Sequence, residues 1–165
     1  MAITKEKKKD ILQKLTDALK EASSVAFVRF SGLSVADTFA MRRAMREEGV
    51  HYYVAKKTLI RRALADRGYA GTIPDMPGEI AIAWGGEDST APARLVYAQG
   101  KKKKDTLTLV GGIFEDAFID AEKMQAIATI PPLPVLRGMF VNVINAPVQG
   151  LVMALDQIRQ SKTEA

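Results

Sequence analysis

Three prolines within four residues, Pro131, Pro132 and Pro134, interrupt this chain of 165 residues. Proline lacks a backbone N–H donor and restricts the residue before it, so a helix or strand is not expected to continue through such a stretch. We therefore predict a domain boundary here, with an amino-terminal domain over residues 1–130 and a carboxy-terminal arm over residues 131–165.

Helical and strand patterns alternate before this boundary. Apolar spacing predicts helices over residues 4–22, 58–66, 91–98 and 121–128, and strands over residues 25–30, 50–55, 79–84 and 105–110. Strands separated by helices are typical of layered proteins. The predicted fold class is therefore α/β, a layered domain with a roughly four-stranded sheet flanked by helices and followed by a helical arm.

One further helix is predicted between the first two strands. Ser34 and Asp37 form a capping-box variant at its start, and Gly49 provides a left-handed end. Its large apolar residues are Phe39, Met41 and Met45.

Composition argues against catalysis. The chain has no cysteine and a single histidine, His51, which excludes disulfides, cysteine nucleophiles, thiolate metal sites and sites built from several histidines. A rival interpretation is a small enzyme using Glu87 and Asp88 or Glu115 and Asp116, but these carboxylates adjoin turns and lack a positioned partner. We therefore predict that the protein is not an enzyme and has no catalytic residue, metal or cofactor.

The net charge of +5 is unevenly distributed. Residues 1–68 hold 15 Lys and Arg against 8 Asp and Glu, whereas residues 69–165 hold 9 against 11. The basic half is therefore expected to face a polyanion, and nucleic acid is the polyanion we predict.

Basic residues of that half fall into three groups, one on each of its predicted helices. Helical spacing brings Arg42 beside Arg46 and Lys57 beside Arg61, and such pairs repel unless an anion lies between them. The basic candidates for RNA binding are Lys7, Lys8, Arg42, Arg43, Arg46, Lys56, Lys57 and Arg61.

Other interpretations stay open for neighbouring residues. The lysines of residues 5–9 could form a solvated helix face, and the lysines of residues 101–104 are expected to lie in a solvated loop, with RNA contact as a secondary role. Tyr52 and Tyr53 could stack on bases, but a tyrosine in a strand more often packs in the core.

The arm is too apolar to stay uncovered. Between residues 133 and 158, 16 of 26 residues are apolar, and they form two amphipathic units divided at Ala146-Pro147. The candidate partner-binding residues are Met139, Phe140, Val143 and Ile144 in a first apolar stripe, and Val148, Leu151, Val152, Leu155 and Ile158 in a second apolar stripe. A similar pattern recurs at an offset of 11 residues, close to three helical turns, which favours a repeated docking site.

Two alternatives exist for the arm. It could pack onto the α/β domain as a core helix, an outcome that periodicity alone does not separate from docking. Residues 138–155 carry no formal charge, but Asn142, Asn145, Pro147 and Gln149 argue against a membrane helix. We therefore expect a protein partner and no membrane partner.

Four motifs carry a resemblance to a known family. They are Phe-Ser-Gly-Leu-Ser-Val at residues 30–35, Met-Arg-Arg-Ala-Met-Arg-Glu-Glu-Gly at 41–49, Val-Ala-Lys-Lys-Thr-Leu at 54–59 and Asn-Ala-Pro-Val-Gln-Gly-Leu-Val at 145–152. With these motifs the chain resembles the ribosomal protein L-ten family, the bacterial large-subunit protein at the base of the translational stalk, over nearly its whole length.

The resemblance implies a function for each part. The α/β domain would bind large-subunit rRNA beside a neighbouring stalk-base ribosomal protein, and the arm would bind dimers of the acidic stalk protein, which recruit translational GTPases. It adds Ser31, Gly32 and Thr58 to the RNA-binding candidates. Where the family commonly has Lys-Asn-Thr-Leu, this chain has Lys at position 57, which keeps a positive charge but loses an amide.

The combined prediction is a non-catalytic ribosomal adaptor. Its amino terminus is charged from Lys5 onward and lacks the apolar core of a secretory signal, so we expect it in the cytoplasm, on the ribosome. Two apolar stripes, followed by polar residues 159–164, predict two stalk dimers. The alternative is a non-ribosomal RNA-binding regulator, which would have no acidic protein partner.

Overall fold

The computed structural model describes residues 5–85, 88–102 and 106–163. The chain separates into two compact units, unit 1 over Met1–Ile130 and unit 2 over Pro131–Ala165.

Unit 1 is built on an antiparallel sheet of five strands. The strands are β1 (Ser24–Phe30), β2 (Val50–Val54), β3 (Glu79–Gly85), β4 (Leu107–Phe114) and β5 (Ala117–Asp120). Their order across the sheet is β2-β3-β1-β4-β5, so β1 is central and β2 and β5 form the edges. The layered α/β fold is confirmed, with one strand more than the rough prediction.

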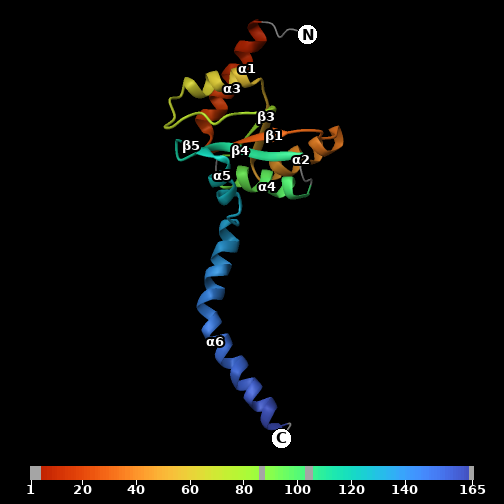
Figure 1. Ribbon diagram of the computed structural model, residues 1–165, viewed down its shortest axis with the longest axis vertical. Helices are drawn as coiled ribbons and strands as arrows, with labels where there is room; N and C mark the ends of the chain where they lie inside the picture. Colours follow the sequence, from red (N-terminus) through yellow and green to blue (C-terminus); the bar gives the residue numbers. More distant parts are fainter. Residues whose placement is uncertain (1–4, 86–87, 103–105, 164–165) are drawn as a thin grey trace. The chain divides into compact units, whose positions relative to one another are not determined.

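Helices cover both faces of this sheet (Figure 1). On one face lie α1 (Lys5–Glu21) and α3 (Lys57–Ala65), and on the other lie α2 (Val35–Glu47), α4 (Ala91–Lys102) and α5 (Ala121–Ala128). Successive residues of a strand point to opposite faces, so Phe27 packs with α1 and α3 whereas Ala26 and Val28 pack with α2, α4 and α5. Unit 1 therefore has three layers and two apolar cores.

The predicted ends of α2 are present in the structure. The Asp37 backbone N–H donates to Ser34 Oγ at 3.2 Å, which satisfies one of the free amides of the first turn. Gly49 has φ +71°, a left-handed conformation that glycine adopts without strain. These two residues fix where β1 gives way to α2 and where β2 begins.

β4 is longer than predicted because its two central glycines do not end it. A Cβ on Gly112 would collide with the Val25 carbonyl oxygen and with Met124, and a Cβ on Gly111 would lie 2.7 Å from the Ile119 carbonyl oxygen. The glycines therefore permit close approach inside the sheet. After them β4 reaches Phe114 and turns into β5, a strand too short for its pattern to be recognised.

One other boundary differs from the predictions, and a further one lies outside the described residues. Helix α4 extends to Lys102 rather than ending near Ala98, so the start of the lysine run at 101–104 is helical, whereas residues 103–105 lie outside the described part. The predicted start of the fourth strand at residue 105 falls there as well.

Unit 2 contains α6 (Leu133–Thr163), a single helix of 31 residues. The predicted helical arm is confirmed, and the helix continues through Pro147, where the two apolar stripes meet. Pro134 lies in the first turn, where a missing N–H costs nothing, but Pro147 removes one hydrogen bond from the helix interior. The two stripes are therefore two segments of one helix.

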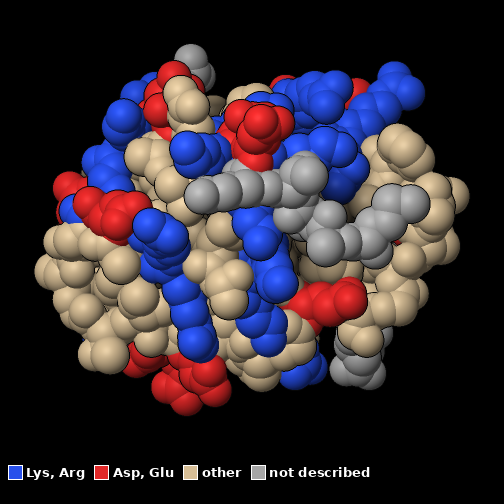
Figure 2. All heavy atoms as spheres, turned by 90° about the horizontal axis from the view of Figure 1, so that it is seen from above, with Lys and Arg blue, Asp and Glu red and all other residues tan. Residues whose placement is uncertain are grey.

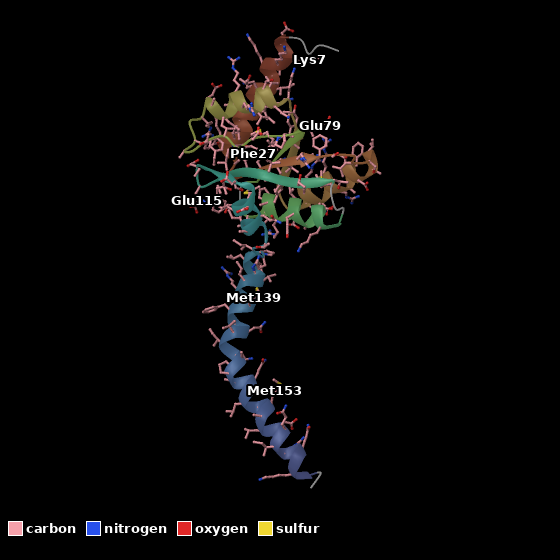
Figure 3. All side chains as sticks on the ribbon, in the orientation of Figure 1. Lys7, Phe27, Glu79, Glu115, Met139 and Met153 are labelled. Carbon is pink, nitrogen blue, oxygen red and sulfur yellow. The ribbon has the colours of Figure 1, made fainter. Side chains whose placement is uncertain are left out.

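Apolar side chains project along the whole of α6, with Met139 and Met153 labelled in Figure 3. By length and composition alone, Leu133–Gln160 is sufficiently long and apolar to cross a membrane. Asn142, Asn145 and Gln149 recur at the helical spacing of one side, so polar groups follow the helix across its middle. The composition test is thus weak evidence for a membrane span.

Candidate nucleic-acid interface and partner-binding helix

Arg42, on α2, is the most firmly held of the predicted RNA-binding residues. Its guanidinium carbon lies 5.7 Å from the centre of the Tyr52 ring, and its Nε is buried with no hydrogen-bond partner among the described residues. Burial raises the pKa of Tyr52 to about 12, against the opposing effect of the Arg42 charge, so this tyrosine stays neutral. Tyr52 thus packs against the core, as expected for a strand tyrosine, and its ring lies beside the Arg42 guanidinium.

The other two arginines of α2 are exposed. Arg43 pairs with Glu47 at 3.2 Å, and their side chains are 84% and 66% exposed. An exposed pair of this kind contributes well under about 1 kcal/mol, so a phosphate can compete for Arg43. Arg46 has no ion-pair partner in the part of the chain that the structure describes.

A second set of candidates meets at one end of the sheet. Phe30 pairs with Glu79 and Val54 pairs with Ala81, so the last residues of β1 and β2 both lie beside the first residues of β3, at the same end of the sheet. A shallow cavity of about 390 Å³ opens there, and its lining includes Phe30, Val54, Lys56, Lys57, Gly78 and Glu79. The candidates Ser31, Gly32 and Thr58 follow directly from these segments and are exposed.

Lys56 is the N-cap residue of α3, directly before the helix, and its side chain makes no capping hydrogen bond. The first amides of a helix have no partner within it, and the positive end of the helix dipole favours an anion. Lys57 is half-buried and Lys56 is exposed beside these amides. This end of α3 is therefore suited to a phosphate oxygen.

Further candidates lie on the same face as α3. Arg61 is 3.6 Å from Asp75 in an exposed ion pair, and Lys7 and Lys8 are exposed near the start of α1. Figure 2, which looks onto the side bearing α1 and α3, shows Lys and Arg spread over much of this face with acidic groups between them. The candidates consequently do not form one patch, because the α2 arginines belong to the opposite face.

Arg29 is a basic residue of this region that the sequence interpretation missed. It is exposed on β1, and its Cδ would lie 3.1 Å from a Cβ on Gly78, so its side chain passes close to the end of the sheet that carries Lys56. An arginine in an otherwise apolar strand was the available signal.

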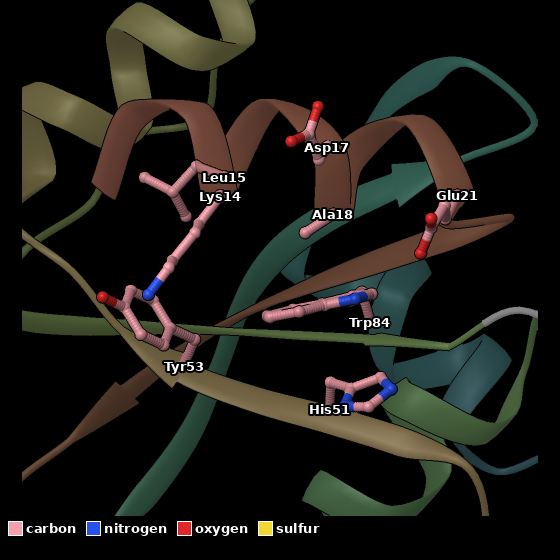
Figure 4. A pocket seen from close by; sticks show the side chains of 8 residues that line it. All are labelled: Lys14, Leu15, Asp17, Ala18, Glu21, His51, Tyr53 and Trp84. Atoms are coloured by element: carbon pink, nitrogen blue, oxygen red, sulfur yellow. The ribbon is translucent and has the colours of Figure 1, made fainter. Parts of the chain in front are cut away.

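A different cavity, between α1 and the strands β2 and β3, has other chemistry. Its volume is about 380 Å³, and its lining includes Lys14, Asp17, Glu21, His51, Tyr53 and Trp84 (Figure 4). The His51 and Trp84 rings stack with centroids 5.5 Å apart. The two carboxylates in its lining do not favour phosphate, so this cavity is not part of the candidate RNA interface.

Asp88, one of the carboxylates considered for an enzyme, has a structural role. Asp88 accepts hydrogen bonds from the Thr90 N–H at 2.9 Å and from the Arg94 guanidinium at 3.0 Å. Burial would raise the pKa of Asp88, but these bonds outweigh it and lower the pKa below its ordinary value. The resulting stabilisation is present above the ordinary carboxyl pKa and is lost as the pH falls through the lowered one.

The other carboxylates considered for an enzyme are Glu115 and Asp116, which lie at a turn, and Glu87. Glu115 and Asp116 are the two central residues of the β4–β5 turn, with φ of 51° and 59°. Glu87 is outside the described residues.

All nine predicted partner-binding residues of α6 are exposed, between 52% and 71%. A helix turns by 100° per residue, so the first apolar stripe and the second apolar stripe are centred about a quarter of a turn apart and about 17 Å apart along the axis. The stripes are therefore two separate surfaces on one rod, each large enough to require a cover in water.

Basic surfaces on a layered α/β unit, together with an exposed apolar helix, define a binding protein rather than an enzyme. The sequence profile of the family described as Ribosomal protein L10 matches residues 3–101. The chain is 34% identical over 159 residues to the large ribosomal subunit protein uL10 of Shouchella clausii (strain KSM-K16), covering 96% of this chain and 95% of that protein. It is 35% identical over 150 residues to uL10 of Clostridium tetani (strain Massachusetts / E88), covering 90% and 86%.

The chain belongs to the ribosomal protein L10 family. The resemblance predicted from its motifs is therefore confirmed. It is a structural protein of the large ribosomal subunit, not an enzyme, and acts in translation on the cytoplasmic ribosome. The alternative of a non-ribosomal regulator is set aside.

Proposed function

We propose that unit 1 binds large-subunit rRNA at the base of the stalk and that α6 anchors two dimers of the acidic stalk protein that recruits translational GTPases. The observation that carries the proposal is the exposure of fourteen large apolar side chains along α6, among them all nine predicted partner-binding residues. Such a surface is stable in water only when a partner covers it. A neighbouring stalk-base ribosomal protein is a further partner that the family resemblance implies.

The charges of α6 support an acidic partner. The helix carries Arg137, Arg159 and Lys162 against the single carboxylate of Asp156. Arg159 and Asp156 are 2.9 Å apart, so the basic excess lies near the two ends of the helix. Complementary charge at the margin of an apolar surface increases the association rate and excludes basic competitors.

The arrangement of basic residues supports RNA binding by unit 1. Exposed or weakly paired cations occur on α1, α2 and α3, and the free amides at the start of α3 lie beside Lys56 and Lys57. Phosphate contacts of this kind account for affinity and for its dependence on salt.

Salt dependence tests the RNA-binding part. Replacing Lys56 and Lys57 by alanine should weaken binding of the full chain to a stalk-base rRNA fragment and lower the slope of log K against log salt by about 0.7–0.9 per lost contact. Lys123→Ala, an exposed lysine on α5, is the matched control and should change neither quantity. An unchanged slope in the double variant would mean that this end of α3 does not contact phosphate.

Native mass spectrometry tests the number of stalk dimers. The parent chain should carry four copies of the acidic stalk protein, and Leu151→Asp with Leu155→Asp should reduce this to two, because each buried leucine is worth about 1.5–3 kcal/mol. Gln149→Asp adds a charge on the polar side of the same helix and should leave four copies bound. Six copies, or two copies on the parent chain, would contradict the assignment of one dimer to each stripe.

A further inference from the structure

The large apolar residues of α2 do not share one environment. Met41 and Met45 are buried, at 4% and 1% exposure, whereas Phe39 is 67% exposed and Val35 is 73% exposed. The rotation of 100° per residue explains the difference, since it places Phe39 about 160° around the helix from Met41. Phe39 therefore contributes nothing to the core and presents an aromatic ring to solvent.

On its helix face, Phe39 follows the exposed Val35 and precedes the arginines of α2. Val35, Phe39, Arg42 and Arg46 follow one another at spacings of four, three and four residues, which is the repeat of a single helix face. Arg43 lies one turn from Phe39 on the adjoining side, although Glu47 pairs with it. Phe39 thus belongs to a stripe whose first two residues are apolar and whose last two are basic.

The position of Arg42 makes this stripe a defined surface. Its contact with the Tyr52 ring holds the guanidinium close to the helix, one turn beyond Phe39. The exposed turn at Ser31 and Gly32 leads directly into the first turn of α2, where Val35 lies. A polyanion that contacts both the turn and the arginines would therefore pass over the Phe39 ring.

We propose that Phe39 is a base-stacking residue, on which an unpaired base of the bound rRNA lies flat while Arg42 and Arg46 contact the adjoining phosphates. The proposal rests on the proposed binding of rRNA by unit 1. Bases within an RNA duplex have no free face, so the ligand is a base that is splayed out of a loop or bulge. Any of the four bases can occupy the ring, because stacking requires only a π face.

Positive charge around the ring favours RNA over a protein partner. Three arginines of α2 lie within two turns of Phe39. The nearby carboxylate of Asp37 accepts a hydrogen bond from the Ser34 hydroxyl at 2.6 Å, at the start of the helix. Stacking adds affinity that does not depend on salt, whereas the arginines add affinity that does. The two contributions are therefore separable in one titration series.

The test compares Phe39 variants of the full chain for binding to a stalk-base rRNA fragment at several salt concentrations. Phe39→Ala should weaken binding about 5- to 100-fold, the range for loss of one stacked base, with the salt slope unchanged. Phe39→Leu keeps apolar bulk but has no π face and should lose a similar factor, whereas Phe39→Trp should retain the parent affinity. Ile130→Ala, an exposed apolar residue of unit 1 that lies outside α2, is the control and should change nothing.

Each departure from this pattern has a definite meaning. If Phe39→Leu binds rRNA as tightly as the parent chain, stacking on Phe39 is wrong. If Phe39→Ala also binds as tightly, Phe39 does not contact the RNA at all. In either case, rRNA binding that still depends on Lys56 and Lys57 would leave the proposed function intact. Absence of salt-dependent RNA binding in the parent chain would overturn both proposals. If Phe39→Ala spares RNA binding but weakens binding of the neighbouring stalk-base protein, the surface is a protein interface and the proposal is wrong.

Discussion

Gly112 shows how one residue can determine the spacing of two layers. It lies in β4 opposite Ala26, and α5 packs so closely that Met124 occupies the space a side chain would need. The obstruction on the other side is the backbone carbonyl of Val25, which cannot rotate away as a side chain could. Tight packing of this kind makes even one added methyl group costly.

Gly112→Ala should therefore lower the free energy of unfolding of unit 1 by about 1–3 kcal/mol, the usual range for overpacking. Trp84 is the only tryptophan of the chain and lies in unit 1, so its emission during urea denaturation reports the change. Gly150→Ala is the matched control, since a Cβ there meets nothing within 4 Å. An unchanged midpoint in Gly112→Ala would show that the layers separate easily.

Individual residues also show where sequence information is sufficient. Ser34 and Gly49 predict the ends of α2 because capping and left-handed turns depend on local chemistry alone. The exposure of Phe39 depends on the direction in which α2 packs, and the role of Gly112 depends on a neighbour from a distant part of the chain. Neither is contained in a local pattern.

At the scale of elements, long apolar repeats in the sequence predict helices and strands, whereas very short ones do not. The nine elements predicted for residues 1–130 all have counterparts in the structure because each is a sustained apolar repeat, whereas β5 was not predicted, because it has four residues and follows a two-residue turn. The helical arm was also predicted, and α6 is continuous although Pro147 lies inside it. A proline lowers helix stability but does not forbid a helix when the flanking turns are otherwise favourable. The binding residues stay predictions at this scale.

The two cores of unit 1 contain no residue of α6. A chain of residues 1–130 should consequently unfold with the same Trp84 transition as the full chain, within about 0.5 kcal/mol, and should retain rRNA affinity while losing the stalk protein. Paired denaturation curves and binding titrations of the two chains measure this. Loss of a cooperative transition on truncation would instead support the alternative in which α6 packs as a core helix.

At the scale of the whole molecule, two kinds of interaction are kept in separate units. Unit 1 carries the basic candidates and two closed apolar cores, whereas unit 2 exposes most of its apolar residues. Rising salt weakens phosphate contacts, but it does not weaken apolar contacts in the same way. The proposed rRNA and stalk-protein interactions should therefore respond differently to the same buffer.

The uncovered surface of α6 also bears on how much of this protein a cell can hold. A free chain exposes its apolar helix to every other free chain, and self-association of such surfaces rises with concentration. Newly made chains in excess of their partner would precipitate or be degraded, whereas chains made together with the partner would stay soluble. If a partner covers α6, the amount of soluble protein should follow the supply of that partner.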